Sequence, residues 1–306
     1  MPRVSIGVPV YNGERYISET LDSLFAQTFG DFELIICDNA SMDRTEQLCR
    51  AYADRDARIR YVRNAKNFGA ARNYRRAFEL SSSKYFRWAN ADDLFAPEGL
   101  ARCVEVLDRE PSVVLTYPKT KFIDERGNVI SEYEDDLHLQ SFKASERFSQ
   151  VMERLGYVNV IYGLIRADIL RKTGLLRNFP GGDIPLVAEL ALYGKFREIP
   201  EFMFFRRLHP GALSSYKVDV SLTQEFFDPS TKGKIPMTQW RHLGAHARSM
   251  MRAPLDFGEK MRLGCLLIRM GIWKRNVLVR ELIEAVRYIV HRLHLTFNKF
   301  FAALSK

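Results

Sequence analysis

The sequence has few cysteines and no long hydrophobic run. Its four cysteines are scattered without a CxxC spacing, which argues against a disulfide framework and against a cysteine-based zinc site. We expect reduced, buried thiols instead. No uncharged apolar run reaches 18 residues, so a membrane-spanning helix is not expected. Residues 1–12 lack the basic, apolar and small-residue order of a secretory signal, and we therefore expect a cytoplasmic protein. The cysteines are Cys37, Cys49, Cys103 and Cys265.

Three phosphate-binding signatures are also missing. No GxGxxG follows the first apolar run, which excludes the dinucleotide fingerprint, and no GxxxxGK(S/T) occurs, which excludes a P-loop. The first loop reads PVYNGERYI (9–17) and is not the glycine-rich, arginine-containing loop of sugar nucleotidyltransferases. That enzyme class is therefore disfavoured.

The positive charge is concentrated near the C-terminus. The chain of 306 residues has a net charge of +9, with 46 Lys and Arg against 37 Asp and Glu. Residues 240–306 hold thirteen of the basic and four of the acidic residues, so the charges of residues 1–239 balance. This distribution predicts a tail that meets an anionic surface such as a membrane or lipid phosphates. It does not predict nucleic-acid binding along the whole chain.

Apolar runs alternate with amphipathic segments in the first third of the chain. This pattern predicts an α/β fold with a mixed, mainly parallel sheet flanked by helices, followed by a C-terminal helical extension. Asp43 fits the N-cap of the second helix, and Pro97 fits the first turn of the fourth. The predicted strands cover 4–10, 32–37, 59–62, 85–89 and 113–117, and the predicted helices cover 14–27, 44–55, 69–80 and 97–108.

The remainder of the chain is less regular. Residues 121–133 predict a hairpin that turns at Glu125–Asn128, because turn-forming residues separate two strand-like runs. Residues 216–238 are polar and contain Pro and Gly, which predicts a loop or lid. Helices are further predicted at 144–155, at 184–194 and from 239 to the end, and strands at 158–165 and 199–208.

Several polar residues follow predicted strands, where ligands bind in parallel sheets. Asp92 and Asp93 follow the fourth strand, and adjacent carboxylates repel each other unless a cation joins them. A divalent ion would bridge them to the phosphates of a nucleotide. The alternative is a solvated pair, one member of which caps the helix at Pro97.

Asp38 and Arg72 are two further candidates. Asp38 ends the second strand, and its carboxylate could accept a hydrogen bond from a uracil or guanine ring. The alternative is a turn residue, since Asp-Asn-Ala-Ser is rich in turn formers. Arg72 could contact the base or diphosphate with its guanidinium group. The alternative is a surface arginine on an amphipathic helix.

In combination, these motifs resemble the family 2 glycosyltransferases, inverting enzymes of the A-type fold. The matching stretches are VSIGVPVYNGERYISETLDSLFAQTFGDFELIICDNASMDRT (4–45), NFGAARN (67–73) and NADDLFAPEGL (90–100), in the family's order and spacing. The resemblance is tight over the first ~115 residues and thins out to about residue 215. It implies a catalytic domain at 1–215, made of a nucleotide-sugar-binding half (1–115) and an acceptor half (116–215). A loop or lid at 216–238 and a basic amphipathic helical tail at 239–306 would follow.

The resemblance also implies a donor site that uses Mn²⁺ or Mg²⁺. Asp92 and Asp93 fall in the family's Asp-x-Asp-Asp metal motif, where Asn90 replaces the first aspartate and removes one negative charge. The implied nucleotide-sugar-binding residues are Pro9, Tyr11, Asn12, Glu14, Asp38, Arg72, Asn90 and Asp92.

Asp183 and His209, in the later part of the chain, complete the implied site. Asp183 takes the place of the general base, and Gly182 stands where the family usually has a glutamate. Gly181 and Gly182 would let the backbone approach a substrate closely; the alternative role of Asp183 is a helix N-cap. The RRLHPG segment (206–211) resembles the family's Arg-x-His element, with Arg207 and His209. In that element His209 would add a metal ligand or touch the diphosphate. The alternative is a structural histidine.

The tail carries an apolar stripe with interspersed arginines. Its steps of three or four residues predict one face of a helix. We expect this face to dock on an anionic membrane, so that the cytoplasmic protein would be peripheral on the inner face. The alternatives are packing onto the catalytic domain or onto a second copy of the chain. The stripe comprises Leu278, Leu282, Val286, Ile289, Leu293, Phe297, Phe300 and Leu304.

The expected activity is metal-dependent, inverting sugar transfer of the hexosyltransferase type. The donor would be a nucleotide sugar, and the acceptor a hydroxyl of a glycan or lipid-linked molecule in cell-envelope or exopolysaccharide synthesis, by analogy with the family. The alternative class is a non-catalytic sugar-nucleotide-binding or scaffold protein of polysaccharide assembly. A sugar nucleotidyltransferase is the weaker enzymatic alternative.

Overall fold

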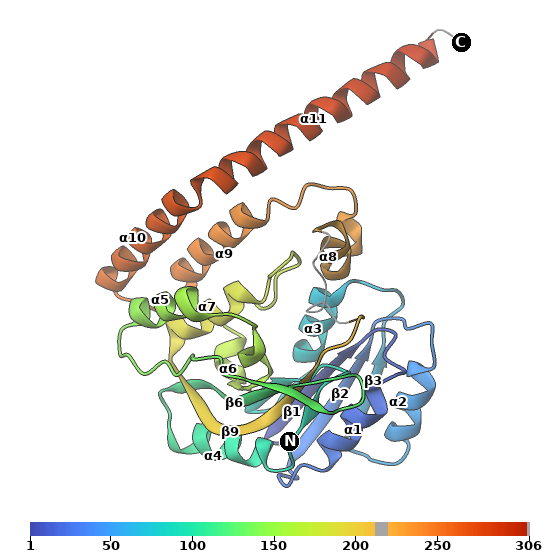
Figure 1. Ribbon diagram of the computed structural model, residues 1–306, viewed down its shortest axis with the longest axis vertical. Coiled ribbons are helices and arrows are strands. Elements are labelled where there is room, and N and C mark those ends of the chain that lie inside the picture. The colour runs from blue at the N-terminus through green and yellow to red at the C-terminus, as the bar shows by residue number, and fades with distance from the viewer. Residues whose placement is uncertain (212–219, 305–306) are drawn as a thin grey trace.

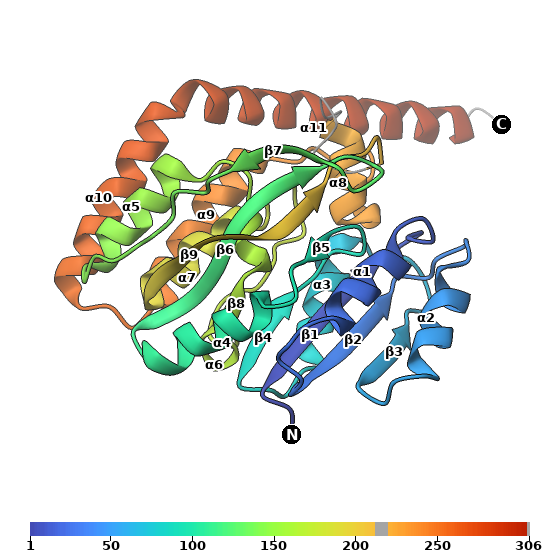
Figure 2. The same ribbon diagram turned by 60° about the horizontal axis from the view of Figure 1, so that its bottom comes forward.

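The computed structural model describes residues 1–211 and 220–304. Within these residues lies a nine-stranded sheet with the order β3-β2-β1-β4-β8-β6-β9-β5, and β7 pairs with β6. Helices cover both faces of the sheet, and further helices follow at the C-terminal end (Figures 1 and 2). The predicted α/β fold with a mixed sheet and a helical extension is confirmed.

The first four strands form the parallel part of the sheet. β1 lies between β2 and β4 and pairs with both in parallel, and β2 pairs in parallel with β3. All seven residues of β1 are buried, as expected for a central strand covered on both faces. Val10 at the end of β1 is in register with Asp38 at the end of β2, so the following loops meet at one edge. The strands are β1 (Val4–Val10), β2 (Phe32–Asp38), β3 (Ile59–Arg63) and β4 (Tyr85–Trp88).

Two sets of helices pack on the two faces through separate apolar cores. Three of the four cysteines are buried, as predicted, whereas Cys265 is exposed because it lies on the outer side of a C-terminal helix. On one face lie α1 (Ile17–Phe25), α2 (Thr45–Ala53) and α4 (Gly99–Arg109); on the other lie α3 (Ala70–Glu79), α5 (Ala144–Arg154), α6 (Ala167–Leu170) and α7 (Ile184–Tyr193).

The second half of the sheet is mixed. β6 (Val113–Ile123) is parallel to β9 (Lys195–Arg207) and antiparallel to β7 (Val129–Tyr133), which confirms the predicted hairpin. The short strand β5 (Leu94–Phe95) was not predicted and pairs with β9.

The predicted strand at 158–165 is wrong over most of its length. A 3₁₀ turn, η1 (Asn159–Tyr162), precedes the short strand β8 (Leu164–Arg166), which is antiparallel to β4 and β6. Asn159, Val160 and Ile161 are consecutive and all buried. A strand would turn alternate side chains to opposite faces, whereas a tight turn inside the core buries all three.

The segment predicted as a loop or lid contains regular structure. Residues 212–219 lie outside the described residues, but α8 (Val220–Phe227) and η3 (Pro229–Thr231) follow. Asp228 caps η3 by accepting a hydrogen bond from the Ser230 amide at 3.0 Å. This segment packs on the start of α3, where a Cβ at Gly69 would lie 2.4 Å from the Phe227 carbonyl oxygen. The domain boundaries at 215 and 238 stay predictions.

Three helices form the C-terminal part: α9 (Thr238–Arg252), α10 (Phe257–Trp273) and α11 (Arg275–Leu304). Leu263 and Leu267 of α10 belong to the core beneath α5 and α7. The start of α11 is anchored as well, because Leu278 is buried. Beyond it, α11 extends away from the body of the molecule (Figure 1). No described helix is both long and apolar enough to cross a membrane.

Candidate active site

The loop after β1 is held against the loop after β2. The Asn12 side chain accepts a hydrogen bond from the Met42 amide at 2.9 Å, and Glu14 accepts one from the Arg44 amide at 2.9 Å. Pro9 is buried within β1, whereas Tyr11 is 43% exposed. Asn12 and Glu14 are exposed too, so of these predicted residues only Pro9 is buried, and their ligand contacts stay predictions.

Asp38 is fully buried at the end of β2. One of its carboxylate oxygens accepts a hydrogen bond from the Ser41 amide at 2.8 Å, which is the turn geometry weighed as an alternative. The other accepts bonds from the Tyr61 hydroxyl at 2.6 Å and from Arg63 at 2.7 Å. Its base-reading role stays a prediction and would require Asp38 to exchange one of these partners.

A network of asparagine side chains positions the predicted arginine. The amide of Asn39 donates to Asn67 at 2.7 Å, and Asn64 donates to both Asn39 and Asn73 at 2.9 Å. The network links the ends of β2 and β3 to the start of α3, from which the exposed Arg72 projects. This network was not predicted, although four asparagines within 35 positions are visible in the sequence.

Asp92 and His209 come together at the carboxyl edge of the sheet. Nε2 of His209 lies 2.9 Å from Oδ2 of Asp92, and both side chains are partly exposed, at 14% and 29%. Arg207 holds the backbone at Asp92 in place, since its Nε donates a hydrogen bond to the Asp92 carbonyl oxygen at 2.9 Å. The structure thus joins two predicted metal ligands from distant segments.

Asp93 points the other way, into the protein. Its two oxygens accept hydrogen bonds from the Arg207 amide and from the Asn90 side chain, each at 2.9 Å. Burial, followed by repulsion from Asp92, raises the pKa of Asp93 to about 7. Asn90 in turn accepts a hydrogen bond from the Tyr74 hydroxyl.

This arrangement gives a physical reason for asparagine at position 90. Its N–H group stabilises the buried Asp93 carboxylate, whereas an aspartate would add a third negative charge beside Asp92 and Asp93.

Asp92 and His209 fit a site for one divalent cation, in which the nucleotide's phosphates would supply most of the remaining ligands. The described residues contain no cluster of three or more His, Cys, Asp or Glu side chains placed to hold an ion. Asp92 and His209 nevertheless offer an oxygen and a nitrogen ligand at a partly exposed edge. Mg²⁺ and Mn²⁺ sites in nucleotide enzymes commonly use one or two protein carboxylates and complete the coordination with phosphates and water. A contact to Asp93 would require a local movement, because its side chain is buried.

Asp183 is the N-cap of α7. Its side chain accepts a hydrogen bond from the Ile184 amide at 3.0 Å, so the capping alternative describes its place in the structure. Burial raises the pKa of this half-buried carboxyl group. The glycine before it packs within the protein, because a Cβ at Gly182 would lie 2.1 Å from the Arg177 carbonyl oxygen. The base role stays a prediction.

Arg206 connects the two parts of the site and was not predicted. It donates to the Asn159 side chain at 2.5 Å. Burial opposes its charge, but neighbouring acidic groups, among them Asp93, Asp92 and Asp183, raise its pKa overall. A single guanidinium group therefore lies within electrostatic range of all three carboxylates. In the sequence, Arg206 and Arg207 look alike, and only the strand alternation of β9 sends them to opposite faces.

Solved structures share this fold. The chain resembles the structure of S. aureus TarS residues 1–349 in complex with UDP-GlcNAc, with a TM-score of 0.65 and 16% identity, covering 94% of this chain and 81% of that one. It also resembles a mannosyltransferase from Pyrobaculum calidifontis in complex with GDP-Man and Mn²⁺, with a TM-score of 0.53 and 15% identity, covering 95% and 87%. At these identities the likeness concerns the fold alone.

Curated relatives match parts of the chain. An uncharacterized glycosyltransferase of Methanocaldococcus jannaschii is 28% identical over 149 residues, which are 48% of this chain and 51% of the relative. Chondroitin synthase of Escherichia coli is 26% identical over 232 residues, 74% of this chain and 32% of the relative. The chain spans about half the length of the first relatives that it matches.

A family model matches the first part of the chain. The model is that of glycosyl transferase family 2, and it aligns with residues 5–173, more than half of the 306 residues. The matched region contains β2 to β4, all but the first residue of β1, and the Asp92–Asp93 pair, whereas β9 lies beyond it. The chain therefore belongs to glycosyl transferase family 2.

Proposed function

We propose that this protein transfers a sugar from a nucleotide-sugar donor to a hydroxyl acceptor, with inversion and with the help of Mn²⁺ or Mg²⁺. Its family membership supports sugar transfer. The observation that carries the proposal is the Asp92–His209 pair at the sheet edge, with Asp183 linked to it electrostatically through Arg206. Arg206 lies within electrostatic range of both Asp92 and Asp183, which supports a site where a leaving phosphate and an incoming hydroxyl would be handled close together.

The donor would lie across the carboxyl ends of β1, β2 and β4. Two proteins with this fold are described in complex with UDP-GlcNAc and with GDP-Man, which supports a nucleotide sugar as the ligand here. The exposed Tyr11 ring would pack on the base, and the exposed Arg72 would contact the base or diphosphate. The remaining proposed contacts are Pro9, Asn12, Glu14, Asp38, Asn90 and Asp92.

Asp92, His209 and Asp93 would hold the cation. When bound, the ion would stabilise the negative charge that grows on the leaving nucleoside diphosphate. The chain's own contribution is to orient Asp92 through His209 and Arg207, and to keep Arg206 nearby as a further positive charge.

Asp183 would accept the proton of the acceptor hydroxyl. Its raised pKa makes the carboxylate a stronger base than an ordinary exposed aspartate. Attack by the hydroxyl oxygen forms the new glycosidic bond as the bond to the diphosphate breaks, and this single displacement inverts the anomeric centre. The N-cap bond to the Ile184 amide orients the carboxylate during this step.

A donor screen tests the function. Purified protein would be mixed with UDP- and GDP-sugars, with Mn²⁺ or with a chelator, and unfolding would be followed by thermal shift, since a ligand of the native state raises its stability. We expect one donor to stabilise the protein when metal is present, and release of the nucleoside diphosphate when an acceptor is added. Donor binding without transfer to any acceptor would instead support the sugar-nucleotide-binding or scaffold role.

We further propose that α10 and α11 dock on an anionic membrane, in keeping with a peripheral protein of the inner face that acts in cell-envelope or exopolysaccharide synthesis. Leu278 is buried, whereas the following apolar residues of α11 are exposed. The stripe residues Leu293, Phe297, Phe300 and Leu304 lie outside the part whose side chains the structure describes. The large apolar residues of α10 and α11 that are described as exposed are Phe257, Met261, Ile268, Ile272, Trp273, Val279, Leu282, Ile283, Val286, Ile289 and Val290.

Liposome flotation tests this docking. The full chain should float with vesicles that contain anionic lipid, and replacing Ile283, Val286 and Ile289 by glutamate should abolish flotation. Equal flotation of both proteins would contradict the docking. A change in mass between the two proteins in lipid-free solution would favour a second copy of the chain as the partner.

A further inference from the structure

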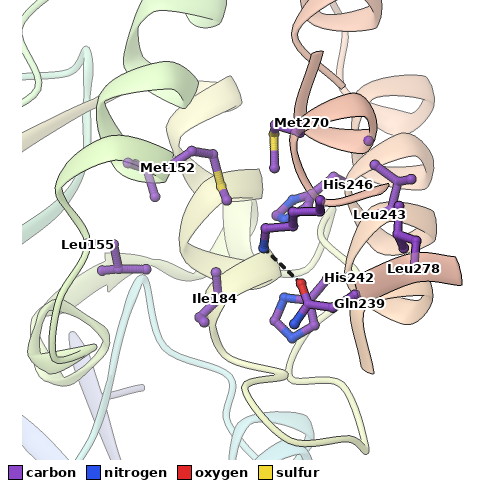
Figure 3. Close-up of a pocket in the computed structure, with 12 residues that line it drawn as sticks. Met152, Leu155, Ile184, Gln239, His242, Leu243, His246, Met270 and Leu278 are labelled. Carbon is purple, nitrogen blue, oxygen red and sulfur yellow. Dashed lines mark hydrogen bonds between the residues drawn. The ribbon is translucent and has the colours of Figure 1, made fainter. Parts of the chain in front are cut away.

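A cavity of about 200 Å³ lies beneath the C-terminal helices, between α5, α9, α10 and the starts of α7 and α11. Figure 3 shows apolar side chains on several sides of it, including Met152, Leu155, Leu243 and Met270. A cavity of about 150 Å³ with such a lining suffices to hold a benzene-sized molecule. The two methionines give the lining a flexible, polarisable surface that adapts to a ligand's shape.

His246 adds a buried polar group to a lining that also contains His242, Gln239 and Lys274. Its side chain is 1% exposed and lines the cavity (Figure 3). Among the described residues, neither nitrogen of its ring has a hydrogen-bond partner. Burial lowers the pKa of His246 to about 3, so the ring is neutral and offers one N–H donor and one acceptor. Such a ring suits a neutral oxygen group rather than an anion.

The cavity adjoins the segment that carries the proposed base. His242 lines it and contacts the Pro180 carbonyl oxygen through Nε2 at 3.1 Å. Ile184, the residue after Asp183, also lines it. A molecule in the cavity would therefore lie directly behind the start of α7.

The opposite side of the cavity leads to the exposed stripe of α11. Leu278 lines the cavity and begins that stripe. Partly exposed Gln239 and Lys274 also line the cavity and are joined by a hydrogen bond of 2.8 Å, drawn as a dashed line in Figure 3. Continuity between an apolar cavity and an exposed apolar helix face points to a chain-like ligand rather than a compact sugar.

We propose that this cavity binds the aliphatic part of a lipid-like acceptor, with His246 hydrogen-bonded to a neutral oxygen of that chain. The acceptor role rests on the proposed function, because it needs sugar transfer near Asp183. The binding site itself does not depend on it. The polar end of the acceptor would extend past Ile184 toward Asp183.

Calorimetric titration of the full chain with 1-octanol, without a donor, tests the site. The wild-type protein should bind one molecule saturably. His246→Phe, which keeps an aromatic ring against Phe148, should weaken binding about tenfold, since it removes one hydrogen bond. Met270→Trp should fill the cavity and abolish binding. Met261→Trp changes an exposed methionine of the same helix and should leave binding unaltered.

Two results would overturn the site: no saturable binding by the wild-type protein, or equal binding by the wild-type protein and Met270→Trp. Melting curves would establish that His246→Phe is folded, so that its weakened binding reports on the ring nitrogens. Sugar transfer measured on the same samples separates the two proposals. Transfer without octanol binding removes the cavity site and leaves the proposed function standing. Octanol binding without transfer to any acceptor supports the site and removes its acceptor role.

Discussion

Nε2 of His209 and Oδ2 of Asp92 lie 2.9 Å apart, although 117 positions separate the two residues in the chain. We expect Asp92→Asn to lower turnover about 100-fold or more, because it removes a negative charge from the proposed donor site. His209→Ala should lower turnover about tenfold and raise the Mn²⁺ concentration needed for half-maximal activity. Steady-state assays over a Mn²⁺ series would measure both effects. His138→Ala, at an exposed histidine, is the control and should behave as wild type.

Asp183→Asn should lower kcat by about 10²–10⁴-fold, the usual contribution of a general base, without weakening donor binding. Because burial raises the pKa of Asp183, the carboxylate forms only at a higher pH than an ordinary aspartate. The wild-type rate should therefore fall on acidification before an ordinary aspartate would protonate. Stopped assays across pH and donor binding by thermal shift would check this. An unchanged kcat in Asp183→Asn would show that Asp183 only caps α7. Asp136→Asn, at an exposed site, is the control and should behave as wild type.

Asn90→Asp should destabilise the protein at pH 8 more than at pH 5. The substitution replaces the N–H donor to Asp93 by a third carboxylate. At pH 8 the carboxylates at positions 90, 92 and 93 would be ionised and would repel one another. At pH 5 the raised pKa of Asp93 keeps that group protonated, which reduces the repulsion. Urea denaturation at the two pH values would measure the difference. An equal loss of stability at both would show that repulsion is not the cause.

The contact between Asp92 and His209 illustrates what sequence can and cannot predict. Each residue belongs to a recognisable motif, and both were predicted as metal ligands. Their 2.9 Å contact depends on the pairing of β5 with β9, which no local pattern reveals because β5 is two residues long. Arg206 was not predicted as a site residue for a related reason. From sequence alone, a basic residue on a strand is expected to be exposed to solvent, and only its neighbours in the fold show otherwise.

The regular elements show the same division. β1 was predicted to the residue, because seven consecutive buried positions leave little ambiguity. α8 and η3 were not predicted, because the Asp-Pro-Ser-Thr-Lys-Gly run at 228–233 has the composition of a loop. Packing against Gly69 and capping by Asp228 organise that segment, and both depend on contacts distant in sequence.

Asp135→Asn should raise stability at pH 8 and have little effect near pH 4. Burial raises the pKa of Asp135 to about 7 in the folded protein. Between the unfolded value near 4 and about 7, the folded state binds the proton more tightly, so the wild-type stability falls as pH rises through this window. The gain at pH 8 is at most about 4 kcal/mol, since a tenfold change in proton affinity is about 1.4 kcal/mol. Denaturation curves at pH 4, 6 and 8 would measure it, and a pH-independent gain would contradict this cause.

Gly69→Ala should cost about 1–3 kcal/mol and weaken donor binding. Gly69 has φ of +86°, and a Cβ there would lie 2.4 Å from the Phe227 carbonyl oxygen. Gly127→Ala is a matched control, because Gly127 also has φ of +86° but no atom within 4 Å of its Cβ position. The difference between the two variants isolates the contact with α8. If both variants lose the same free energy of unfolding in urea, backbone strain alone explains the loss and the contact with Phe227 contributes nothing.

The pairing of β9 with β5 determines when the carboxylates of Asp92 and Asp93 acquire their arrangement. β9 enters the sheet between β6 and β5, and its Arg207 amide is one of the two groups that hold Asp93. A nascent chain or a fragment that ends before residue 195 contains the whole acidic motif yet lacks this amide. The acidic edge therefore reaches its final geometry only once β9 has paired with β6 and β5, so a correctly arranged Asp93 reports that this late strand is in place.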